Sequence, residues 1–280
     1  MRARAARLVA FAGGILLAVA ALWQAGTLLS QPVNHPVQVD GDQFTIVQFE
    51  RTRGSLLRVP RATRCALLMH GVRADRSVMV PRALMLRDLG LTSLAIDLQG
   101  HGETGGEMIT FGHREAQDAR NGVEYLRGQG CRKVLVIGQS LGGAAALLGD
   151  GPVAADAFVL ESVYPTIEDA VANRLGMRFG MAGRLAAPLL YLQLPLRAGV
   201  GSADLRPLDA VRKLRVPVLV AGGSQDLQTP PEETRRLFDA VPGRKTLWLV
   251  AGAVHQDLHA YDPAQYKEKL SAFMETSLIE

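Results

Sequence analysis

Cysteine is nearly absent from this chain, and so are the spacings that would hold a metal ion. Cys65 and Cys131 are the only two cysteines, and their separation is not that of a zinc or iron–sulfur site. No histidine pair stands at ligand spacing with an acid, which argues against a histidine-based metal centre. Charged residues make up 21% and no repeat or low-complexity tract is found, so disorder is not expected. We therefore expect neither a metal nor a cofactor.

Net charge is low outside the first few residues. The formal charge of the chain is +4, but Arg2, Arg4 and Arg7 all precede the first acid, Asp40. Apart from these three arginines, basic and acidic residues are almost equal in number. A nearly neutral body offers no basic surface for nucleic acid, so we expect no nucleic-acid partner.

The body of the sequence alternates short apolar runs with amphipathic segments. Its 280 residues are 48% apolar, which suits one large domain. The predicted strands are Cys65–Met69, Leu91–Ile96, Lys133–Ile137, Ala157–Leu160, Val216–Ala221 and Thr246–Val250. The predicted helices are Val78–Leu89, Glu115–Arg127, Pro231–Ala240 and Tyr261–Ile279, and residues 44–59 predict a hairpin around Arg53-Gly54. This alternation predicts an α/β domain over residues 43–280, with a mostly parallel central sheet and helices on both faces.

A long apolar segment, Leu8–Leu29, follows the three N-terminal arginines. At 1.5 Å per residue, a helix of this length would span roughly 33 Å, enough for a bilayer core. The basic flank predicts a cytoplasmic N-terminus and a catalytic domain outside the cytoplasm, periplasmic or extracellular. We therefore predict a transmembrane anchor over residues 1–30, followed by a linker at residues 31–42 that contains Pro32 and Pro36.

A cleaved signal peptide is the alternative reading of the same segment. Small residues at Ala18 and Ala20, or at Ala25 and Gly26, could serve a signal peptidase, and the domain would then be secreted. The apolar run is longer than the usual core of a signal peptide, which favours the uncleaved anchor.

The stretch Gly138-Gln139-Ser140-Leu141-Gly142 carries the strongest functional signal. It follows the apolar run Lys133–Ile137 and precedes a good helix former, so the serine sits on a sharp strand-to-helix turn. The flanking glycines are expected because a Cβ atom there would collide with the neighbouring elements. This context predicts that Ser140 is a nucleophile rather than a capping residue.

A serine nucleophile needs a base and a group that orients the base. Asp226 follows a predicted strand and a glycine turn, and His255 follows the last predicted strand and a short loop. Both residues are expected at the carboxyl edge of the sheet, beside Ser140. His255 would take the serine proton, and Asp226 would fix the tautomer of the imidazole.

The oxyanion hole is expected to use two backbone amides. One is the N–H of Leu141, the residue after the nucleophile. The other comes from the turn after the first central strand, His70-Gly71-Val72, which nominates the N–H of Val72. Gly71 would let the backbone approach a substrate closely.

Other acids and histidines are weaker candidates for the triad. Glu161 ends the strand after Ser140 and is an alternative acid, but Asp226 has the better turn context. His101 and His113 flank a loop that could approach the site. His259 lies four residues past His255, and His35 lies in the linker. We expect structural or exposed roles for these four histidines.

Residues 167–214 break the alternation of strands and helices. They are apolar, poor in strand signals and too long for an ordinary connection between two strands of one sheet. We expect a small helical cap over the active site, with methionine and leucine lining an adaptable apolar pocket or simply packing on the main domain.

The two cysteines each precede a predicted strand. If those strands are parallel neighbours, both thiols lie at the same end of the sheet. A domain outside the cytoplasm would permit a disulfide, and two unpaired buried thiols are the equal alternative.

These pieces together resemble the α/β-hydrolase superfamily, and most of all the membrane-anchored serine hydrolases of the Bem46 and ABHD type. The resemblance covers residues 43–279. It is carried, in chain order, by His70-Gly71, Asp97–Gly102, Gly138–Gly143, the Asp226 turn with Thr229-Pro230, and Gly252–His255. It implies hydrolysis of carboxylic esters, thioesters or lipid acyl bonds through an acyl-enzyme, without a metal. It also implies a structural role for the Asp97–Gly102 loop.

The sequence thus predicts a membrane-tethered serine hydrolase that acts on acyl esters or lipid-like substrates. A non-catalytic binding module with the same fold is one alternative, but all three triad candidates are present. A serine peptidase is another, but the chain offers no propeller-like domain and no acidic anchor for a peptide amine. Haloalkane or epoxide chemistry is less expected, because such relatives carry aspartate at the nucleophile position. Acyl length and oligomeric state are not set by the sequence.

Overall fold

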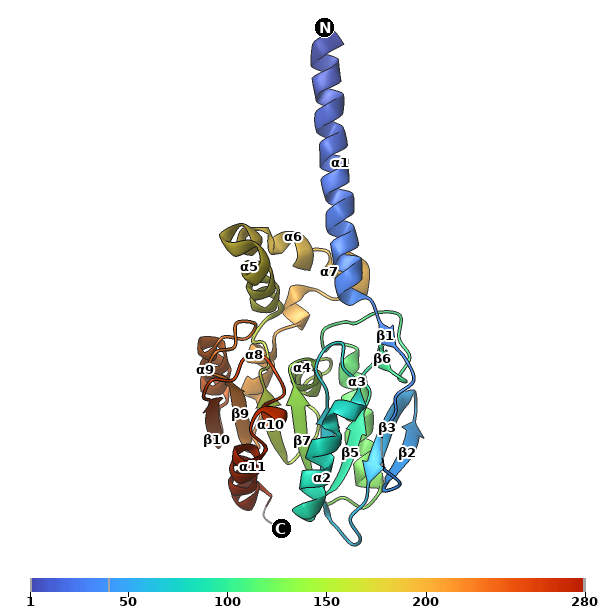
Figure 1. Ribbon diagram of the computed structural model, residues 1–280, viewed down its shortest axis with the longest axis vertical. Helices are drawn as coiled ribbons and strands as arrows, with labels where there is room; N and C mark the ends of the chain where they lie inside the picture. Colours follow the sequence, from blue (N-terminus) through green and yellow to red (C-terminus); the bar gives the residue numbers. More distant parts are fainter. Residues whose placement is uncertain (1, 40, 279–280) are drawn as a thin grey trace.

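A computed structural model of the protein places a sheet of eight strands at its centre (Figure 1). The structure describes residues 2–39 and 41–278, and for residues 2–10, 12, 15 and 18 it describes the backbone alone. The strands are β2 (Phe44–Phe49), β3 (Thr52–Leu57), β4 (Arg64–Met69), β5 (Thr92–Ile96), β7 (Lys133–Gln139), β8 (Ala157–Glu161), β9 (Val218–Gly223) and β10 (Lys245–Val250). They lie in the order β10-β9-β8-β7-β4-β5-β3-β2.

All strand pairs are parallel except those that β3 makes with β5 and β2. The central strands are buried on both faces, as their unbroken apolar runs require. Because the strands are parallel, the residues that follow β7, β8, β9 and β10 all lie at one edge of the sheet.

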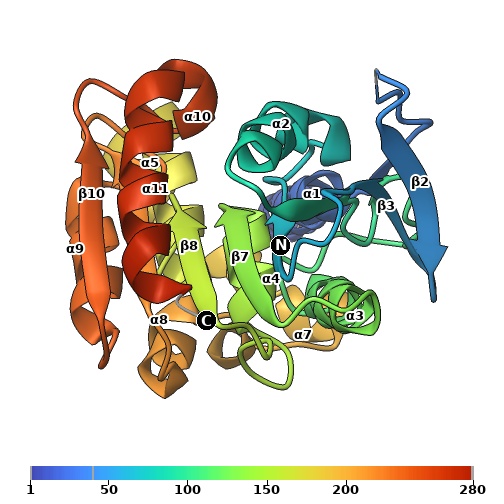
Figure 2. The ribbon, with the colours of Figure 1, turned by 90° about the horizontal axis from the view of Figure 1, so that it is seen from below.

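Helices cover both faces of the sheet (Figure 2). One face is covered by α3 (Glu115–Gly128), α4 (Leu141–Leu147), α8 (Pro207–Ala210) and α9 (Pro231–Ala240). The other is covered by α2 (Val80–Asp88), α10 (Leu258–Tyr261) and α11 (Pro263–Ser277). In α3, Ala119, Val123 and Leu126 recur at helical spacing and point into the core. The predicted fold class, a mostly parallel sheet between two helical layers, is confirmed.

The predicted N-terminal hairpin is present, but its turn lies earlier than Arg53-Gly54. The strands meet around Glu50 and Arg51, where Glu50 has a φ of 49°. Gly54 lies inside β3 instead, because a Cβ atom there would come within 2.9 Å of the Leu94 side chain on β5. The glycine therefore serves close strand packing, and its reading as a turn residue was wrong.

Between β8 and β9 the described chain forms helices and 3₁₀ turns but no strand of the sheet. These are α5 (Ile167–Ala186), α6 (Pro188–Tyr191), α7 (Leu194–Ala198), η2 (Ser202–Asp204), α8 and η3 (Val211–Lys213). Helix α5 is broken at Gly180, whose φ is 60°. Helices α5, α6 and α7 lie at the end of the molecule from which the N-terminal helix leaves (Figure 1).

Helix α1 (Arg2–Ser30) contains the predicted membrane-spanning segment and extends away from the body (Figure 1). The side chains of its basic flank, Arg2, Arg4 and Arg7, lie outside the described residues, as does that of Ala18. Within the described part of the chain, none of the helices combines the length and the apolar character that a membrane crossing requires.

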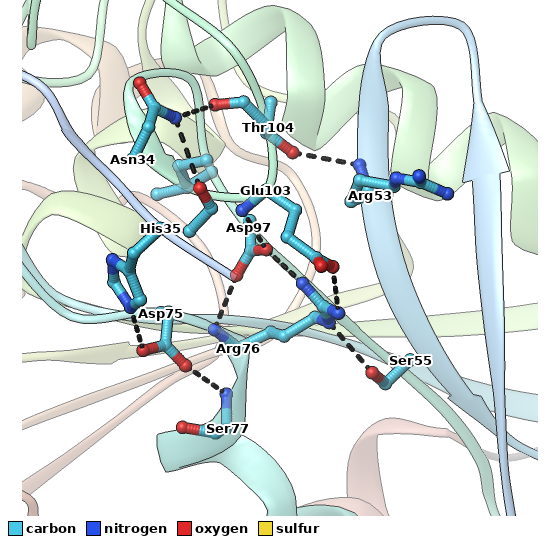
Figure 3. Close-up of polar contacts among 12 residues, drawn as sticks. Asn34, His35, Arg53, Ser55, Asp75, Arg76, Ser77, Asp97, Glu103 and Thr104 are labelled. Carbon is cyan, nitrogen blue, oxygen red and sulfur yellow. Dashed lines mark hydrogen bonds and ion pairs between the residues drawn. The ribbon is translucent and has the colours of Figure 1, made fainter. Parts of the chain in front are cut away.

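The predicted linker runs along the body rather than free of it. Its strand β1 (Val33–Asn34) pairs in parallel with β6 (His101–Gly102). The Asn34 side-chain amide donates to the Thr104 carbonyl at 2.8 Å, and the His35 ring lies 3.0 Å from the Asp75 carboxylate (Figure 3). These contacts join the chain after α1 to the loops that follow β4 and β5.

The loop that begins at Asp97 is held by a buried arginine at the start of η1 (Arg76–Met79). The backbone N–H of Arg76 donates to the Asp97 carboxylate at 2.7 Å, and its guanidinium pairs with both Asp97 and Glu103 (Figure 3). The Arg76 guanidinium also donates to the Ser55 hydroxyl at 2.9 Å. The backbone N–H and all three guanidinium nitrogens of Arg76 therefore hold this loop in place, as a structural role requires.

Cys65 and Cys131 form a disulfide, with their Cα atoms 5.8 Å apart. Cys65 lies on β4, and Cys131 lies just before the neighbouring parallel strand β7. The two cysteines therefore meet at the same end of the sheet, opposite the edge that carries Ser140. Of the two equal expectations, pairing is the one that the structure shows.

Candidate active site

Ser140 stands between β7 and α4 in a strained backbone conformation. Its φ is 48° and its ψ is −107°, a region that L-residues rarely adopt. A Cβ atom on Gly138 would lie 2.5 Å from the Gly143 nitrogen, and one on Gly142 would lie 2.5 Å from the Met69 carbonyl. The neighbouring glycines are therefore needed to pack this turn against the sheet, as expected.

A cavity of about 600 Å³ opens at Ser140. Leu141 and Val72, the two expected oxyanion donors, line it together with Ser140. Its remaining walls are mostly apolar and come from α1, from the main domain and from side chains of the cap such as Leu175 and Leu190. A largely apolar cavity that reaches the Ser140 side chain can accommodate an apolar group.

Asp226 and His255 are brought together from the ends of β9 and β10. The carboxylate of Asp226 is buried, and its Oδ1 atom accepts the N–H groups of Gln228 and Thr229, each at 2.8 Å. Its Oδ2 atom lies 2.8 Å from Nδ1 of His255. A carboxylate at this distance favours the tautomer with hydrogen on Nδ1, which leaves Nε2 of His255 free to act as a base.

Ser140 lies at the same edge of the sheet as this pair, because β7 to β10 are adjacent and parallel. Among the contacts of the described residues, the Ser140 hydroxyl makes no hydrogen bond with His255. Catalytic hydrogen bonds are often long or misaligned before substrate binds. The structure thus joins two members of the expected triad and leaves the third unbonded at the shared edge.

The turn expected to supply the second oxyanion donor is fixed by His70. Nε2 of His70 accepts the N–H of Leu98 at 3.1 Å, so the ring hydrogen is on Nδ1, which donates to the Gly71 carbonyl at 2.7 Å. Burial lowers the pKa of His70 to about 4, which keeps the ring neutral in this role. A Cβ atom on Gly71 would lie 3.8 Å from the Ser140 Cβ, which places this turn beside Ser140.

Glu161, the alternative acid, is committed elsewhere. Its buried carboxylate pairs with Arg82 of α2 at 2.7 Å and accepts the hydroxyl of Tyr266 on α11. It makes no hydrogen bond with His255 among the described contacts. Arg82 and Tyr266 lie on the sheet face covered by α2 and α11, so the Glu161 carboxylate is part of the buried core on that face.

The remaining histidines also lie away from the Asp226–His255 pair. His101 packs against His70, with ring centroids 5.1 Å apart, and burial together with that neighbour lowers its pKa to about 4. His259 packs against Tyr266, and His113 lines a separate hollow of about 260 Å³ beside α3. His35 is exposed and faces Asp75. None of the four shares a hydrogen bond with Ser140 among the described contacts.

Two features of the site were not found from the sequence. Arg82 forms a second ion pair, with Asp257, only two residues beyond His255. The last turns of α1 also form a wall of the Ser140 cavity through Ala25, Leu28 and Leu29. No local pattern distinguishes a cavity-lining leucine from any other in an apolar run, so this contact could be seen only in three dimensions.

Across residues 2–39 and 41–278, no three His, Cys, Asp or Glu side chains converge as a metal ion would require.

The chain is 24% identical to the uncharacterized protein YqkD of Bacillus subtilis over 214 residues, 75% of this chain and 70% of that protein. It is 30% identical to an uncharacterized protein of Mycobacterium tuberculosis over 221 residues, 76% of this chain and 70% of that protein.

Solved structures share the same fold. The esterase Pf2001 of Pyrococcus furiosus superposes with a TM-score of 0.69 at 20% identity, covering 88% of this chain and 100% of the esterase. Residues 66–268, which run from β4 through the Ser140 turn and the Asp226–His255 pair into α11, match the alpha/beta hydrolase family. Fold, strand order and sequence match therefore agree, and the chain belongs to the alpha/beta hydrolase family.

Proposed function

We propose that the protein is a serine hydrolase that cleaves carboxylic ester, thioester or lipid acyl bonds with Ser140, His255 and Asp226 as its triad. The observation that carries the proposal is the Asp226–His255 hydrogen bond, at 2.8 Å, on the sheet edge where Ser140 opens into an apolar cavity. The expected order of nucleophile, acid and base along the chain supports it further.

In the proposed mechanism, the Ser140 hydroxyl attacks the acyl carbonyl while Nε2 of His255 takes its proton. Asp226 holds the ring and stabilises the imidazolium that forms. The N–H groups of Leu141 and Val72 stabilise the oxyanion. The imidazolium then protonates the leaving alcohol or thiol, and an acyl-enzyme on Ser140 remains. Water, deprotonated by His255, attacks the acyl-enzyme. The imidazolium then returns that proton to Oγ of Ser140 as the acid leaves.

The Ser140–His255 hydrogen bond is expected to form when substrate binds. For this bond to form, the serine side chain would rotate or the loop after β10 would shift. Such tightening is common between free enzymes and their substrate complexes.

The substrate is proposed to be hydrophobic or lipid-like. The cavity is walled by aliphatic residues of α1 and the cap, such as Leu29 and Leu190, and its volume of about 600 Å³ suits an acyl chain rather than a large polar group. The arginines that also line it, Arg73, Arg174 and Arg178, would suit an acidic part of the substrate.

Labelling with a fluorophosphonate probe tests the proposal. The native chain should label and hydrolyse p-nitrophenyl esters, and Ser140→Ala should abolish both. Ser162→Ala is the matched control, since this serine also follows a strand and has a positive φ of 47°, yet lies outside the triad. If Ser140→Ala still labels and turns over esters, the nucleophile is misassigned. If the native chain does neither, a non-catalytic binding module becomes the better reading.

We further propose that the catalytic domain lies outside the cytoplasm, periplasmic or extracellular, either tethered through α1 or secreted after cleavage. The Cys65–Cys131 disulfide supports this location, because disulfides persist in oxidising compartments. Thiol-blocking reagent added to intact expressing cells, before lysis and non-reducing electrophoresis, should find this pair oxidised. Two blocked thiols in the folded protein would contradict the proposal.

A further inference from the structure

The cap exposes an unusually apolar surface, here called the cap face. It consists of Phe179, Met181, Leu185, Leu189, Leu192 and Leu196. Each of these side chains is more than half exposed, and Leu196 reaches 81%. They lie on α5, α6 and α7 or the short turns between them, at the end of the molecule from which α1 leaves (Figure 1). Scattered exposed leucines are ordinary, but this many on one small cap mark a surface that something covers.

The charges around the cap face have one sign. Between residues 170 and 203 the chain contains four arginines and no aspartate or glutamate. Of the four, Arg178 and Arg184 are exposed and make no ion pair among the described contacts. Apolar side chains interleaved with unpaired arginines match a surface whose headgroups are anionic and whose interior is apolar.

The Ser140 cavity opens at this surface. Met177 and Phe179 line the cavity and are 52% and 65% exposed, so they belong both to its wall and to the outside of the protein. Leu28 of α1 also lines the cavity, and its side chain is 54% exposed. An acyl chain that passes between α1 and α5 would enter the cavity without crossing water.

Helix α1 is fixed beside the cap face by polar contacts at its foot. The Arg197 guanidinium of α7 stacks on the Trp23 ring, with its central carbon 3.8 Å from the ring centroid, and also donates to the Trp23 carbonyl and the Thr27 hydroxyl. From the core side, Arg73 donates to the Leu28 carbonyl at 2.5 Å and the N–H of Ile109 donates to the Ser30 carbonyl at 2.7 Å.

The chain after α1 is fastened as well, through the Asn34 and His35 contacts drawn in Figure 3. The exposed apolar side chains further out on α1, among them Phe11, Leu16 and Leu17, therefore continue outward from the same end of the molecule as the cap face. One apolar layer could cover both.

We propose that the cap face docks on the surface of an anionic lipid bilayer, with Arg178 and Arg184 at its headgroups, and that the Ser140 cavity draws an acyl chain from that bilayer. The docking follows from the exposed apolar and basic side chains alone. The withdrawal of an acyl chain rests on the proposed hydrolase function.

A fluorescent label on the cap face tests the docking directly. The native cysteines are paired, so Leu185→Cys gives the full chain one free thiol for an environment-sensitive fluorophore. Ile46→Cys, on the outer strand β2, labels an exposed aliphatic position away from the cap as the control. Both are made in a Ser140→Ala background, so that hydrolysis cannot alter the vesicles and loss of activity cannot imitate loss of docking.

On vesicles of phosphatidylcholine and phosphatidylglycerol in equal amounts, the label at position 185 should shift its emission to shorter wavelength. It should also lose most of its intensity to nitroxide-labelled lipids, while the label at 46 should do neither. Arg178→Glu with Arg184→Glu should reduce both effects at position 185. The matched pair Arg132→Glu with Lys213→Glu makes the same charge change at exposed positions before the amino ends of β7 and β9, away from the edge that carries Ser140. This pair should leave both effects at position 185 unchanged.

Three results would overturn the docking. The label at 185 could stay in water while the chain is bound to vesicles through α1. Its emission could shift without vesicles, by an amount that increases with protein concentration. In that case a second copy of the chain covers the cap face. The vesicle effect could also be the same on pure phosphatidylcholine and insensitive to the arginine changes, which would remove the recognition of anionic lipid. None of these measurements depends on catalysis by Ser140. Each can therefore be distinguished from a failure of the proposed hydrolase function.

Discussion

Arg82 and Asp257 form an ion pair, 2.8 Å between Nη1 and Oδ2, that ties helix α2 to the loop carrying His255. Arg82 is fully buried and also pairs with Glu161, so its position is fixed from two sides. Burial raises the pKa of Asp257, but the Arg82 guanidinium, the Ala260 N–H and His259 together outweigh it, so the pKa is lowered. His255 is thus held by its hydrogen bond to Asp226 and, through Asp257 two residues later, by a buried cation.

Asp257→Asn should loosen the His255 loop without removing a helix cap. An asparagine can still accept the N–H of Ala260 as Asp257 does, but it cannot pair with Arg82. We expect a loss of about 2 kcal/mol in unfolding free energy, because a buried guanidinium loses a charged partner. We also expect a lower kcat on p-nitrophenyl esters. Asp262→Asn is the control, since Asp262 caps α11 and makes no ion pair among the described contacts. Equal effects of the two changes would mean that only capping matters.

Asp226→Asn should leave the protein folded but nearly inactive. An asparagine can keep the contacts with the N–H groups of Gln228 and Thr229, but it no longer favours the tautomer of His255 that leaves Nε2 as a base. By analogy with other triads, kcat should fall by about four orders of magnitude. His255→Ala should be similarly inactive. Steady-state ester hydrolysis measures the effect, with circular dichroism as the check on folding. Substantial activity in Asp226→Asn would send the search for the acid elsewhere.

Stability should fall as the pH drops below 6.5, because two buried histidines resist protonation. The pKa values of His70 and His101 are about 4 in the folded protein, against 6.5 for an unburied ring. Between pH 6.5 and pH 4 the unfolded chain therefore binds protons that the folded one does not, which favours unfolding. Each histidine should lower the free energy of unfolding by roughly 2 kcal/mol at pH 5.

Urea unfolding at pH 7 and pH 5 measures this dependence. His101→Asn should flatten it, since the amide can replace the contact of Nδ1 with the Gln99 carbonyl and does not titrate. His35→Asn is the control, because contacts with the Val33 carbonyl and Asp75 raise the pKa of that exposed ring. An unchanged pH dependence in His101→Asn would show that this ring is not a source of it.

Leu28→Trp should shorten the range of acyl chains that the enzyme accepts. Leu28 lines the Ser140 cavity from α1, and a larger side chain there narrows the cavity. For long-chain p-nitrophenyl esters we expect kcat/KM to fall by about tenfold, or about 1.4 kcal/mol, with little change for the acetate. Leu17→Trp, on the same helix at 74% exposure and outside the cavity, is the control. A uniform loss over all chain lengths in Leu28→Trp would place the helix outside the acyl site.

The disulfide should be an appreciable part of the stability. Cys65 and Cys131 are 66 residues apart, and closing a loop of that length restrains the unfolded chain by about 4 kcal/mol on the entropic account. Cys65→Ala with Cys131→Ala should lower the urea midpoint accordingly. Thiol titration of the unfolded, unreduced native chain should find no free thiol. Two titratable thiols would show that the pair does not form.

Much of the fold could be predicted from the sequence because its signals are local. The run Lys133–Ile137 is continuously apolar because β7 is buried on both faces, and the glycines around Ser140 follow from the space beside β4 and α4. The hairpin turn was misplaced at Arg53-Gly54, because a glycine required by packing and a glycine required by a turn look the same in one dimension. The neighbour that decides it, Leu94, is forty residues away in the chain.

The sequence by itself determined the strand-turn-helix at Ser140, the order of the candidate triad and the α/β class, since each depends on residues next to one another or on a repeated pattern. Only the tertiary structure decided that Cys65 meets Cys131, that Arg82 supports the His255 loop, and that the last turns of α1 line the cavity. Those contacts join segments that are far apart in the chain, so they produce no repeating pattern in the sequence. They arise from which buried charges and apolar surfaces must find partners once the sheet has formed.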